Sequence, residues 1–367
     1  MQDPTIDWTS FLSRHPAALD PGIIHTGLAG KRVLITGAGG YIGSALARFI
    51  AALPLESLIL LDISERGLFE IGATLYEDAA STQPVLIAGD LCDTALLRET
   101  FQSHRPQIIF HAAACKHVAL MEANPFTAAY NNILGTHRLL RAADEARVAQ
   151  VIVISTDKAV DPVGIMGATK RVAELLVLAH EGATQVKAVR LANVLGSTGS
   201  VGPIFLRQIA RGGPITITDP ACTRYFLLID EVVQGLIAAL AVDASPAILI
   251  PEAGDPLSIG ELAKFLLKQL PPDPSACEIR FTGLRPGDKL TEHMLAQDES
   301  SAPSNISTLS KVSSSWKVST LEAVMQEITV AIHQRNLSRL LNALTTIVPT
   351  YQPSQQLLKA ASASLQS

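Results

Sequence analysis

Short apolar runs alternate with longer stretches of helix-forming residues through the first half of the chain. The runs are rich in valine, isoleucine and leucine, as strands buried on both faces of a sheet usually are. They cover residues 32–36, 57–61, 84–88, 107–110, 151–154 and 185–191. Strands that alternate with helices in this way indicate an α/β fold built on one doubly wound parallel sheet, the Rossmann arrangement.

The pattern changes after residue 205. Residues 212–218 and 247–250 are short apolar runs, which we interpret as strands of a smaller substrate-binding lobe of mixed α/β structure. Residues 300–315 are rich in serine and are expected to form a loop, and 321–344 have the periodicity of an amphipathic helix before a frayed end. The predicted division is an irregular lead-in over 1–30, a Rossmann domain over 31–205, the lobe over 206–300, and a C-terminal loop and helix over 301–367.

Composition narrows the class of protein. A chain of 367 residues that is 48% hydrophobic can bury a large core, and a net charge of −5 provides no basic surface for nucleic acid. The four cysteines lie in separate segments without C-x-x-C spacing, so neither a metal site nor a disulfide framework is predicted. The apolar stretches are shorter than the roughly 20 residues of a membrane span, and the N-terminus lacks the pattern of a signal peptide. We therefore expect a cytoplasmic protein without a membrane segment.

A glycine-rich loop joins the first predicted strand to a helix. Gly37 allows a tight turn, Gly40 lets the backbone approach a pyrophosphate, and Gly43 permits close packing of the helix on the strand. Phosphates bind at the N-terminus of such a helix because its backbone N–H groups are unpaired there. In this strand–loop–helix context the glycine spacing predicts a dinucleotide site.

Two acidic residues end the next two strands. Asp62 is placed to accept hydrogen bonds from an adenosine ribose and to repel a 2′-phosphate, which favours NAD over NADP. Arg66 keeps NADP open, because an arginine there can pair with the 2′-phosphate. Asp90 is a candidate for contact with the adenine amino group, or for capping the helix that follows it.

The fourth strand runs into a stretch of small residues. Three alanines at 112–114 leave room for a flat ligand against the backbone, and Lys116 and His117 then face the crevice. His117 is as well explained by a structural role. Asn132 lies in a helical stretch with a second asparagine beside it, although asparagine is a poor helix former. We expect Asn132 to hold a water molecule or to fix the backbone near Lys116.

A polar cluster follows the β-branched run 151–154. Thr156, Asp157 and Lys158 lie at the carboxyl end of this strand, where open parallel sheets bind their ligands. A helix begins near Gly167, and Lys170 projects from its first turn. These polar side chains are therefore the candidates for chemistry.

Met166 departs from a known active-site pattern. A strand-end serine or threonine followed by Tyr-x-x-x-Lys is typical of short-chain dehydrogenases/reductases, and Met166 stands at the tyrosine position. A thioether can neither donate nor accept a proton. If hydride chemistry occurs at this site, the proton transfers fall to the other polar residues of the cluster.

Arg224 and Arg285 lie in two predicted loops of the second half of the chain. A guanidinium grips a phosphate through a fork of donors. Combined with a dinucleotide fold, the two arginines suggest a substrate that carries its own diphosphate.

The chain resembles the UDP-N-acetylglucosamine 4,6-dehydratases, which are extended short-chain dehydrogenases/reductases of polysaccharide biosynthesis. The matching motifs span nearly the whole chain, and the MGATKR form makes Met166 a family trait. The motifs are LAGKRVLITGAGGYIGS, HAAACKHVALMEANP, NNILGT, STDKAVDP, MGATKR, NVLGSTGSVGPIF, TRYF, GLRPGDKL and IVPTYQP. Long members of the family carry membrane helices ahead of a segment like 1–30, and this chain resembles the soluble form.

The resemblance implies roles for the polar cluster. NAD would take a hydride from C4 of the sugar, Lys158 would remove the C5 proton, Asp157 would protonate the departing 6-hydroxyl, and the hydride would return to C6. Thr156 would hold the 4-hydroxyl, and Lys170 would bind the nicotinamide ribose. An acid and a base must then work at one pH, which requires burial to shift the pKa values of Asp157 and Lys158 toward each other.

The resemblance also implies three sets of site residues, although Tyr41 and Cys115 depart from the usual residues. The catalytic set is Thr156, Asp157, Lys158, Met166 and Lys170. The cofactor-binding set is Gly37, Gly39, Gly40, Tyr41, Ile42, Gly43, Asp62, Asp90, Leu91, Ala112, Ala113, Ala114, Asn132 and Lys170. The substrate-binding set is Lys116, His117, Asn193, Ser200, Val201, Arg224 and Arg285.

Two other functions fit parts of the pattern. A nucleotide-sugar 4-epimerase needs hydride transfer at one carbon only, and it has no use for Asp157 and Lys158 as an elimination pair. A non-catalytic protein that binds NAD or a nucleotide sugar would hold its ligand and release no product. A UDP-sugar is the expected partner molecule, and a homo-oligomer is the expected assembly.

Overall fold

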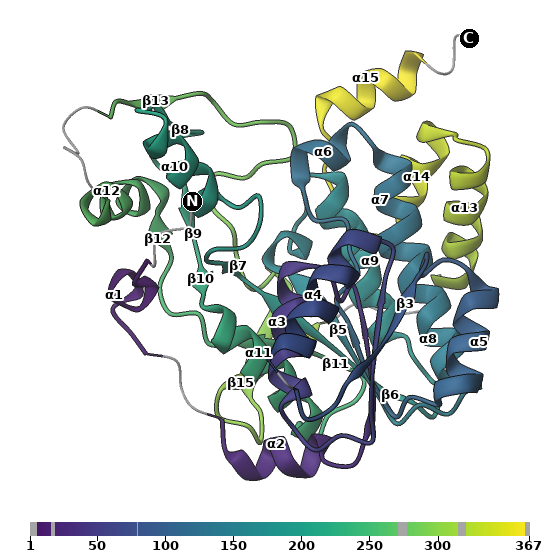
Figure 1. Ribbon diagram of the computed structural model, residues 1–367. Helices are drawn as coiled ribbons and strands as arrows, with labels where there is room; N and C mark the ends of the chain where they lie inside the picture. Colours follow the sequence, from purple (N-terminus) through teal and green to yellow (C-terminus); the bar gives the residue numbers. More distant parts are fainter. Residues whose placement is uncertain (1–5, 16–18, 79, 271–276, 315–320, 364–367) are drawn as a thin grey trace.

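A large, mostly parallel sheet organises the protein. The computed structural model describes residues 6–15, 19–78, 80–270, 277–314 and 321–363. Nine strands within these residues form one sheet in the order β14-β15-β11-β6-β5-β4-β1-β2-β3 (Figure 1). Their bounds are β1 Arg32–Thr36, β2 Ser57–Asp62, β3 Pro84–Ala88, β4 Ile108–His111, β5 Gln150–Thr156, β6 Gln185–Leu191, β11 Ala247–Pro251, β14 Glu299–Pro303 and β15 Leu309–Ser314.

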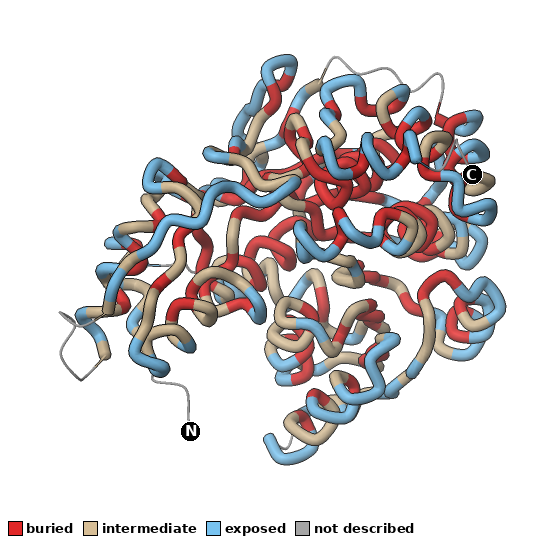
Figure 2. The backbone as a smooth tube through the Cα atoms, turned by 90° about the horizontal axis from the view of Figure 1, so that it is seen from above, coloured by how far each residue is buried: buried red, intermediate tan, exposed pale blue. Residues whose placement is uncertain are grey.

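Successive residues of the central strands face opposite layers of helices. In β1, Leu34 packs into one apolar core, and its neighbours Val33 and Ile35 pack into the other. Figure 2 shows the buried backbone gathered in the middle of the molecule. The helices of the first core are α5 Thr94–His104, α8 Thr136–Glu145, α9 Ile165–Leu178, α13 Leu321–His333 and α14 Leu337–Ile347. Those of the second are α2 Pro21–Leu28, α3 Tyr41–Ala51, α4 Glu65–Glu77 and α11 Ile229–Ala238. The predicted α/β Rossmann fold is confirmed.

A smaller lobe with its own apolar core lies beside this sheet, at the left of Figure 1. Strand β8 (Ile215–Ile217) pairs in parallel with β13 (Ile279–Phe281), and helices α10 (Val201–Ala210) and α12 (Ile259–Gln269) pack around the pair. Two short pairings lead into the lobe: β7 (Asn193–Val194) with β10 (Phe226–Leu227), and β9 (Thr223–Arg224) with β12 (Leu257–Ser258).

Two expectations about strands are wrong. Residues 247–250 do not join the smaller lobe, because β11 pairs in parallel with β6 and extends the main sheet. Residues 300–315 include more than a loop, because β14 and β15 form an antiparallel hairpin and β15 pairs with β11. Serine-rich segments carry little periodicity, so only their pairing with a preformed strand makes them strands. The domain boundaries at 31, 206 and 301 stay predictions.

Both ends of the chain contain more helix than expected. In the lead-in, Asp7 caps α1 (Trp8–Leu12) and Asp20 caps α2, in each case by accepting backbone N–H bonds. The predicted helix 321–344 is two helices, α13 and α14, separated at Arg335, whose φ is 51°. Residues 355–363, expected to be frayed, form α15 (Gln355–Ala363), and the residues after them lie outside the described part.

A buried ion network ties the C-terminal hairpin to the centre of the sheet. Arg190 of β6 donates to Glu174 of α9 at 2.8 Å and to Glu299 of β14 at 2.7 Å, and all three side chains are fully buried. Arg171 adds a contact of 2.7 Å to Glu299. Burial alone would raise the pKa of Glu299, but the two arginines outweigh it and lower that pKa to about 2. The charges are therefore buried as a mutually neutralising set.

None of the helices in the described ranges is both long and apolar enough to cross a membrane.

Removal of one charge from this network should destabilise the protein strongly. Glu174→Gln leaves Arg190 without one of its two buried carboxylates, so we expect the free energy of unfolding to fall by about 3–5 kcal/mol. Urea unfolding followed by circular dichroism measures the change. Because the pKa values of Glu174 and Glu299 are lowered on folding, wild-type stability should be retained above about pH 4.5 and lost as the pH falls toward about 2. Glu70→Gln, at an exposed ion pair, is the control and should leave the urea midpoint unchanged. An unchanged midpoint for Glu174→Gln would contradict this reading of the network.

Candidate functional site

The glycine loop between β1 and α3 is packed too tightly for larger residues. Gly37 has a φ of 71°, and a Cβ atom there would lie 2.4 Å from the backbone nitrogen of Ala113. A Cβ atom on Gly43 would lie 2.1 Å from the carbonyl oxygen of Gly37, and one on Gly39 would lie 2.7 Å from Gly67 of α4. The tight turn and the close helix packing predicted for Gly37 and Gly43 are therefore present. A Cβ atom on Gly40 would meet only the Gly37 oxygen, at 3.2 Å, so the N-terminus of α3 stays open for a ligand.

The Asp62 side chain contacts this loop. Its carboxylate accepts hydrogen bonds from the backbone N–H groups of Gly39 and Ser64, both at 2.8 Å. Arg66 does not turn toward the loop: its side chain is 87% exposed and pairs with Glu70 at 2.7 Å. Asp62 is therefore the charged group at the end of β2 that contacts the glycine loop.

Asp90 does not cap the helix that follows it, which corrects one of the two readings of this residue. Asp93 caps α5, and Asp90 accepts a hydrogen bond from the Cys92 N–H at 2.8 Å. Leu91, between them, is buried in the first core. The contact with adenine stays a prediction.

Asn132 fixes the backbone of the loop that follows β4, which is one of the two roles expected for it. Its side chain accepts a hydrogen bond from the Cys115 N–H at 2.8 Å and donates to the Cys115 carbonyl at 3.0 Å. It also donates to the Thr169 hydroxyl of α9 at 2.9 Å. Asn132 belongs to a π-helical turn, Tyr130–Gly135, a distortion that often occurs at functional sites. Lys116, next to the clamped residue, is exposed.

Three loops meet at the carboxyl edge of the sheet. The exposed His117 imidazole lies against Gly199, where a Cβ atom would be 2.5 Å from the ring. The Tyr41 hydroxyl donates to the Leu195 carbonyl at 3.1 Å, so this side chain bridges α3 to the same loop. Ser200 precedes α10 and makes no side-chain capping bond. The remaining predicted positions near this edge are Ile42, Ala112, Ala113 and Val201, which are half-buried, and Ala114, which is exposed.

The strand-end cluster forms a hydrogen-bonded chain. Thr156 donates to Asp157 at 2.9 Å, and the Lys158 ammonium donates to the same Asp157 oxygen at 2.9 Å and to the Asn193 side-chain oxygen at 3.1 Å. Asp157 is fully buried, and the Lys158 side chain is 22% exposed. Asn193 is therefore a partner of Lys158 in this structure.

The electrostatics of Lys158 contradict the expectation that burial brings its pKa toward that of Asp157. Burial alone would lower the pKa of Lys158, but the neighbouring Asp157 and Glu292 carboxylates outweigh it and raise that pKa. In this structure Lys158 therefore rests as an ammonium ion that donates a hydrogen bond to Asp157. Two carboxylates within 4.0 Å decide the direction, and the second, Glu292, is far away in the sequence.

Helix α9 carries Met166 and Lys170 into the site. The Lys170 ammonium donates to the Ile154 carbonyl at 2.5 Å, and burial lowers its pKa to about 8. Met166 is buried and lines the pocket without a polar partner. The N-terminus of this helix is held from outside, because Glu122 accepts a hydrogen bond from the Ile165 N–H at 2.5 Å.

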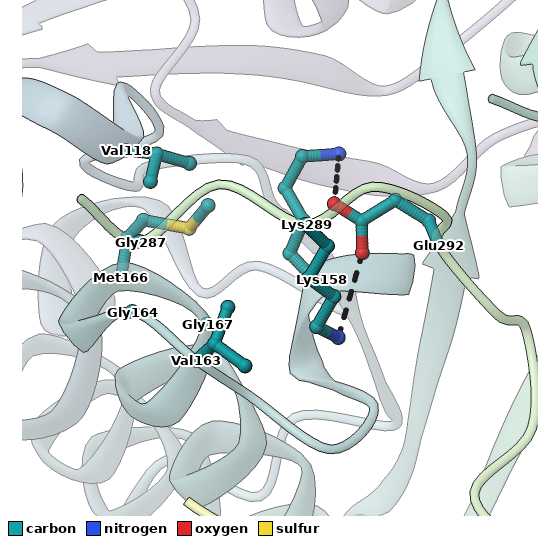
Figure 3. A pocket seen from close by; sticks show the side chains of 9 residues that line it. All are labelled: Val118, Lys158, Val163, Gly164, Met166, Gly167, Gly287, Lys289 and Glu292. Carbon is teal, nitrogen blue, oxygen red and sulfur yellow. Dashed lines mark ion pairs between the residues drawn. The ribbon is translucent and has the colours of Figure 1, made fainter. Parts of the chain in front are cut away.

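Glu292 is a member of the site that sequence reasoning missed. It is 3% exposed and lies between two lysines, with Lys158 at 3.9 Å and Lys289 at 3.5 Å (Figure 3). These residues and Met166 line a pocket with about 210 Å³ of empty space, part of it open to solvent. The available signal was a carboxylate two residues after the GLRPGDKL motif, but nothing in the sequence places it beside Lys158.

The two predicted phosphate-gripping arginines differ in their surroundings. Arg224 donates to the carbonyls of Lys289 at 2.7 Å and of Leu290 at 2.9 Å, so it holds the loop that carries the pocket residues. Arg285 is 58% exposed and pairs with Asp288 at 2.7 Å. Contact of either arginine with a diphosphate stays a prediction.

Comparison with known proteins agrees with the fold and the motifs. A family described as polysaccharide biosynthesis protein matches residues 33–314. Over 300 residues the chain is 39% identical to the capsular polysaccharide biosynthesis protein CapD of Staphylococcus aureus, covering 80% of this chain and 50% of CapD. The chain is also 35% identical to the UDP-glucose 4-epimerase of Rickettsia rickettsii, covering 73% of this chain and 79% of the epimerase.

A solved structure shares the architecture. The dTDP-glucose 4,6-dehydratase DesIV of Streptomyces venezuelae, a double mutant with NAD and DAU bound, superposes with a TM-score of 0.64 at 26% identity, covering 71% of this chain and 87% of DesIV. Fold and site together define a Rossmann protein of the short-chain dehydrogenase/reductase type. Within that class, the chain belongs to the polysaccharide biosynthesis family of nucleotide-sugar dehydratases and epimerases. It spans about half the length of relatives such as CapD.

Loss of the Asn132 side chain should release the loop after β4. Asn132→Ala removes both hydrogen bonds to Cys115, so we expect the free energy of unfolding to fall by about 1–3 kcal/mol and the Cys115 amide to exchange faster with deuterated solvent. Hydrogen exchange followed by mass spectrometry measures the second effect. Asn124→Ala is the matched control, since the exposed Asn124 donates to the Leu120 carbonyl of the preceding helix α6 (Val118–Glu122) and not to the loop after β4. Unchanged exchange at Cys115 would show that Asn132 is not the clamp.

Proposed function

We propose that the protein is an NAD-dependent 4,6-dehydratase that converts UDP-N-acetylglucosamine to the 4-keto-6-deoxy sugar nucleotide. The observation that carries the proposal is the pairing of Asp157 and Lys158 at 2.9 Å, buried at the carboxyl end of β5. An elimination of water needs a base for the C5 proton and an acid for the departing 6-oxygen. The pair contains both groups and one exchangeable proton between them.

The residues around the glycine loop fit a dinucleotide cofactor. Gly40 leaves the N-terminus of α3 open for a pyrophosphate, and Asp62 lies where a ribose would be held. When bound, the nicotinamide supplies hydride exchange with the sugar, at C4 and at C6. Lys170 is buried nearby, and its lowered pKa leaves it partly protonated close to neutral pH, so it can bind the ribose and follow a change of charge. The closeness of DesIV, described with NAD bound, supports the same cofactor.

Asp157 and Lys158 divide the proton transfers between them. A carbonyl at C4 makes the C5 proton acidic, and Lys158 can accept that proton only as a neutral amine. Transfer of a proton from Lys158 to Asp157 along their hydrogen bond yields that amine and a protonated acid. The C5–H and C6–O bonds then break, a C5–C6 double bond forms, and water leaves with the Asp157 proton. The elimination leaves Lys158 as an ammonium ion and Asp157 as a carboxylate.

A 4-epimerase is the second candidate. The likeness to a protein named UDP-glucose 4-epimerase, of which this chain covers 79%, favours it. An epimerase would leave Asp157 and Lys158 without a proton to eliminate, and Met166 removes the tyrosine that such enzymes use. These two features support the dehydratase over the epimerase.

Incubation with UDP-N-acetylglucosamine in deuterated water separates the candidates. A dehydratase yields a product that has lost one water and carries deuterium at C5, which mass spectrometry and proton NMR detect. Lys158→Ala should lower the rate by at least about a hundredfold, because it removes the base. Lys311→Ala, on the exposed face of β15, is the control and should turn over normally. An isomer of unchanged mass would support the epimerase, and bound cofactor without product would support a binding protein.

Asp62 should set the choice between NAD and NADP. Asp62→Asn removes the charge that repels a 2′-phosphate, so we expect the ratio of NADP to NAD affinity to rise by about tenfold or more. Titration calorimetry with each cofactor gives the ratio. Arg66→Ala is the matched test, since its exposed side chain pairs with Glu70 and should not affect either affinity. Weaker NADP binding in Arg66→Ala would instead assign that arginine to a 2′-phosphate.

A further inference from the structure

Glu292 has three cationic side chains around it, and the family motifs assign no role to this residue. One carboxylate oxygen is 3.9 Å from the Lys158 ammonium and 4.0 Å from Arg224, and the other is 3.5 Å from Lys289. The second oxygen has no hydrogen-bond partner among the described residues, and the same is true of one Asp157 oxygen. Asp157 and Glu292, the two buried carboxylates near Lys158, therefore each have one oxygen that can still accept a hydrogen bond.

We propose that Glu292 is a positioning residue that holds Lys158 as an ammonium ion and so sets the pH above which the Asp157–Lys158 pair loses its one shared proton. This inference rests on the proposed function for its consequence in catalysis, but the electrostatic statement stands on the geometry alone. Unlike Asp157, Glu292 reaches Lys158 without a direct hydrogen bond. It therefore acts through its charge.

All charged groups around Lys158 bear on this proposal. Asp157 and Glu292 favour its ammonium form, Arg224 opposes it, and Asn193 is a neutral acceptor. Lys289 pairs with Glu292 and also donates to the Val160 carbonyl, so it offsets part of the Glu292 charge. The direct ion pair with Asp157 and the weaker field of Glu292 together exceed the effect of burial.

The cations around Glu292 link the electric field at Lys158 to anions bound nearby. Besides Lys158, Glu292 has Lys289 at 3.5 Å and Arg224 at 4.0 Å, and Arg224 is one of the two arginines predicted to contact a diphosphate. A bound anion would draw on the same cations and add its own negative charge, so the field at Lys158 depends on what occupies this region. Loss of the Glu292 charge changes that field without touching Asp157.

Competitive labelling of lysines tests the proposal without any turnover. Acetic anhydride reacts only with neutral amines, and peptide mass spectrometry compares Lys158 with the exposed Lys311 as internal reference. In Glu292→Gln at pH 8, we expect Lys158 to react about tenfold faster, because loss of a unit charge about 4 Å away lowers its pKa by about one unit. Glu292→Asp keeps the charge and should restore most of the slow reaction.

Thr291→Ala is the control for a purely structural effect. It alters the residue beside Glu292, whose hydroxyl contacts Thr223 at 3.5 Å, without a change of charge. Lys158 labelling in Thr291→Ala should match the wild type. An equal rise in Thr291→Ala and Glu292→Gln would overturn the proposal, and so would unchanged labelling in folded Glu292→Gln. Should Glu292→Gln fail to fold, Glu292→Ala removes the same charge and carries the test, and unchanged labelling of Lys158 there overturns the proposal.

A second measurement ties Glu292 to catalysis and separates the two proposals. In Glu292→Gln the descending limb of the kcat/KM pH profile, where the Asp157–Lys158 pair loses its one shared proton, should move to lower pH by about one unit, with rescue by Glu292→Asp. Faster labelling without any dehydration in the wild type would contradict the dehydratase and leave the Glu292 inference standing. Dehydration with unchanged labelling would support the dehydratase and contradict the role of Glu292.

Discussion

A charge that is removed from water must be paired, and the carboxyl end of this sheet is built around that constraint. One group of charges is formed by Arg190, Glu174 and Glu299, and all three side chains are buried. In a second group, Lys158 lies between Asp157 and Glu292. The first group has every charge in close contact. In the second group, one oxygen of Asp157 and one of Glu292 have no hydrogen-bond partner among the described residues.

The need to pair buried charges also explains why segments near the C-terminus pack on the domain formed by the first half of the chain. Glu299 begins β14, more than a hundred residues after Arg190, yet their contact fixes the hairpin beside α9. The same helix is held at its N-terminus by Glu122, which also accepts a hydrogen bond from Ser354 near the C-terminus at 2.5 Å. The position of α9, and with it Lys170, therefore depends on contacts from several distant parts of the chain.

Two lysines of one site are shifted in opposite directions by their surroundings. Lys170 is buried against a backbone carbonyl and has a lowered pKa of about 8, whereas two carboxylates raise the pKa of Lys158. Burial lowers the pKa of both lysines, and the number of carboxylates nearby decides whether the net shift is downward or upward. Groups with identical chemistry thus acquire different pKa values from their neighbours.

Local patterns in the sequence determined the parallel strands from β1 to β6, the glycine loop, Asp62 and the strand-end cluster, because each is set by residues close together in the chain. Tertiary structure alone decided that β11, β14 and β15 join the main sheet and that Glu292 reaches Lys158. These features need a partner strand or an opposite charge from a distant segment. Periodicity and turn chemistry describe a segment's own conformation, whereas pairing and electrostatics depend on which segments the fold brings together.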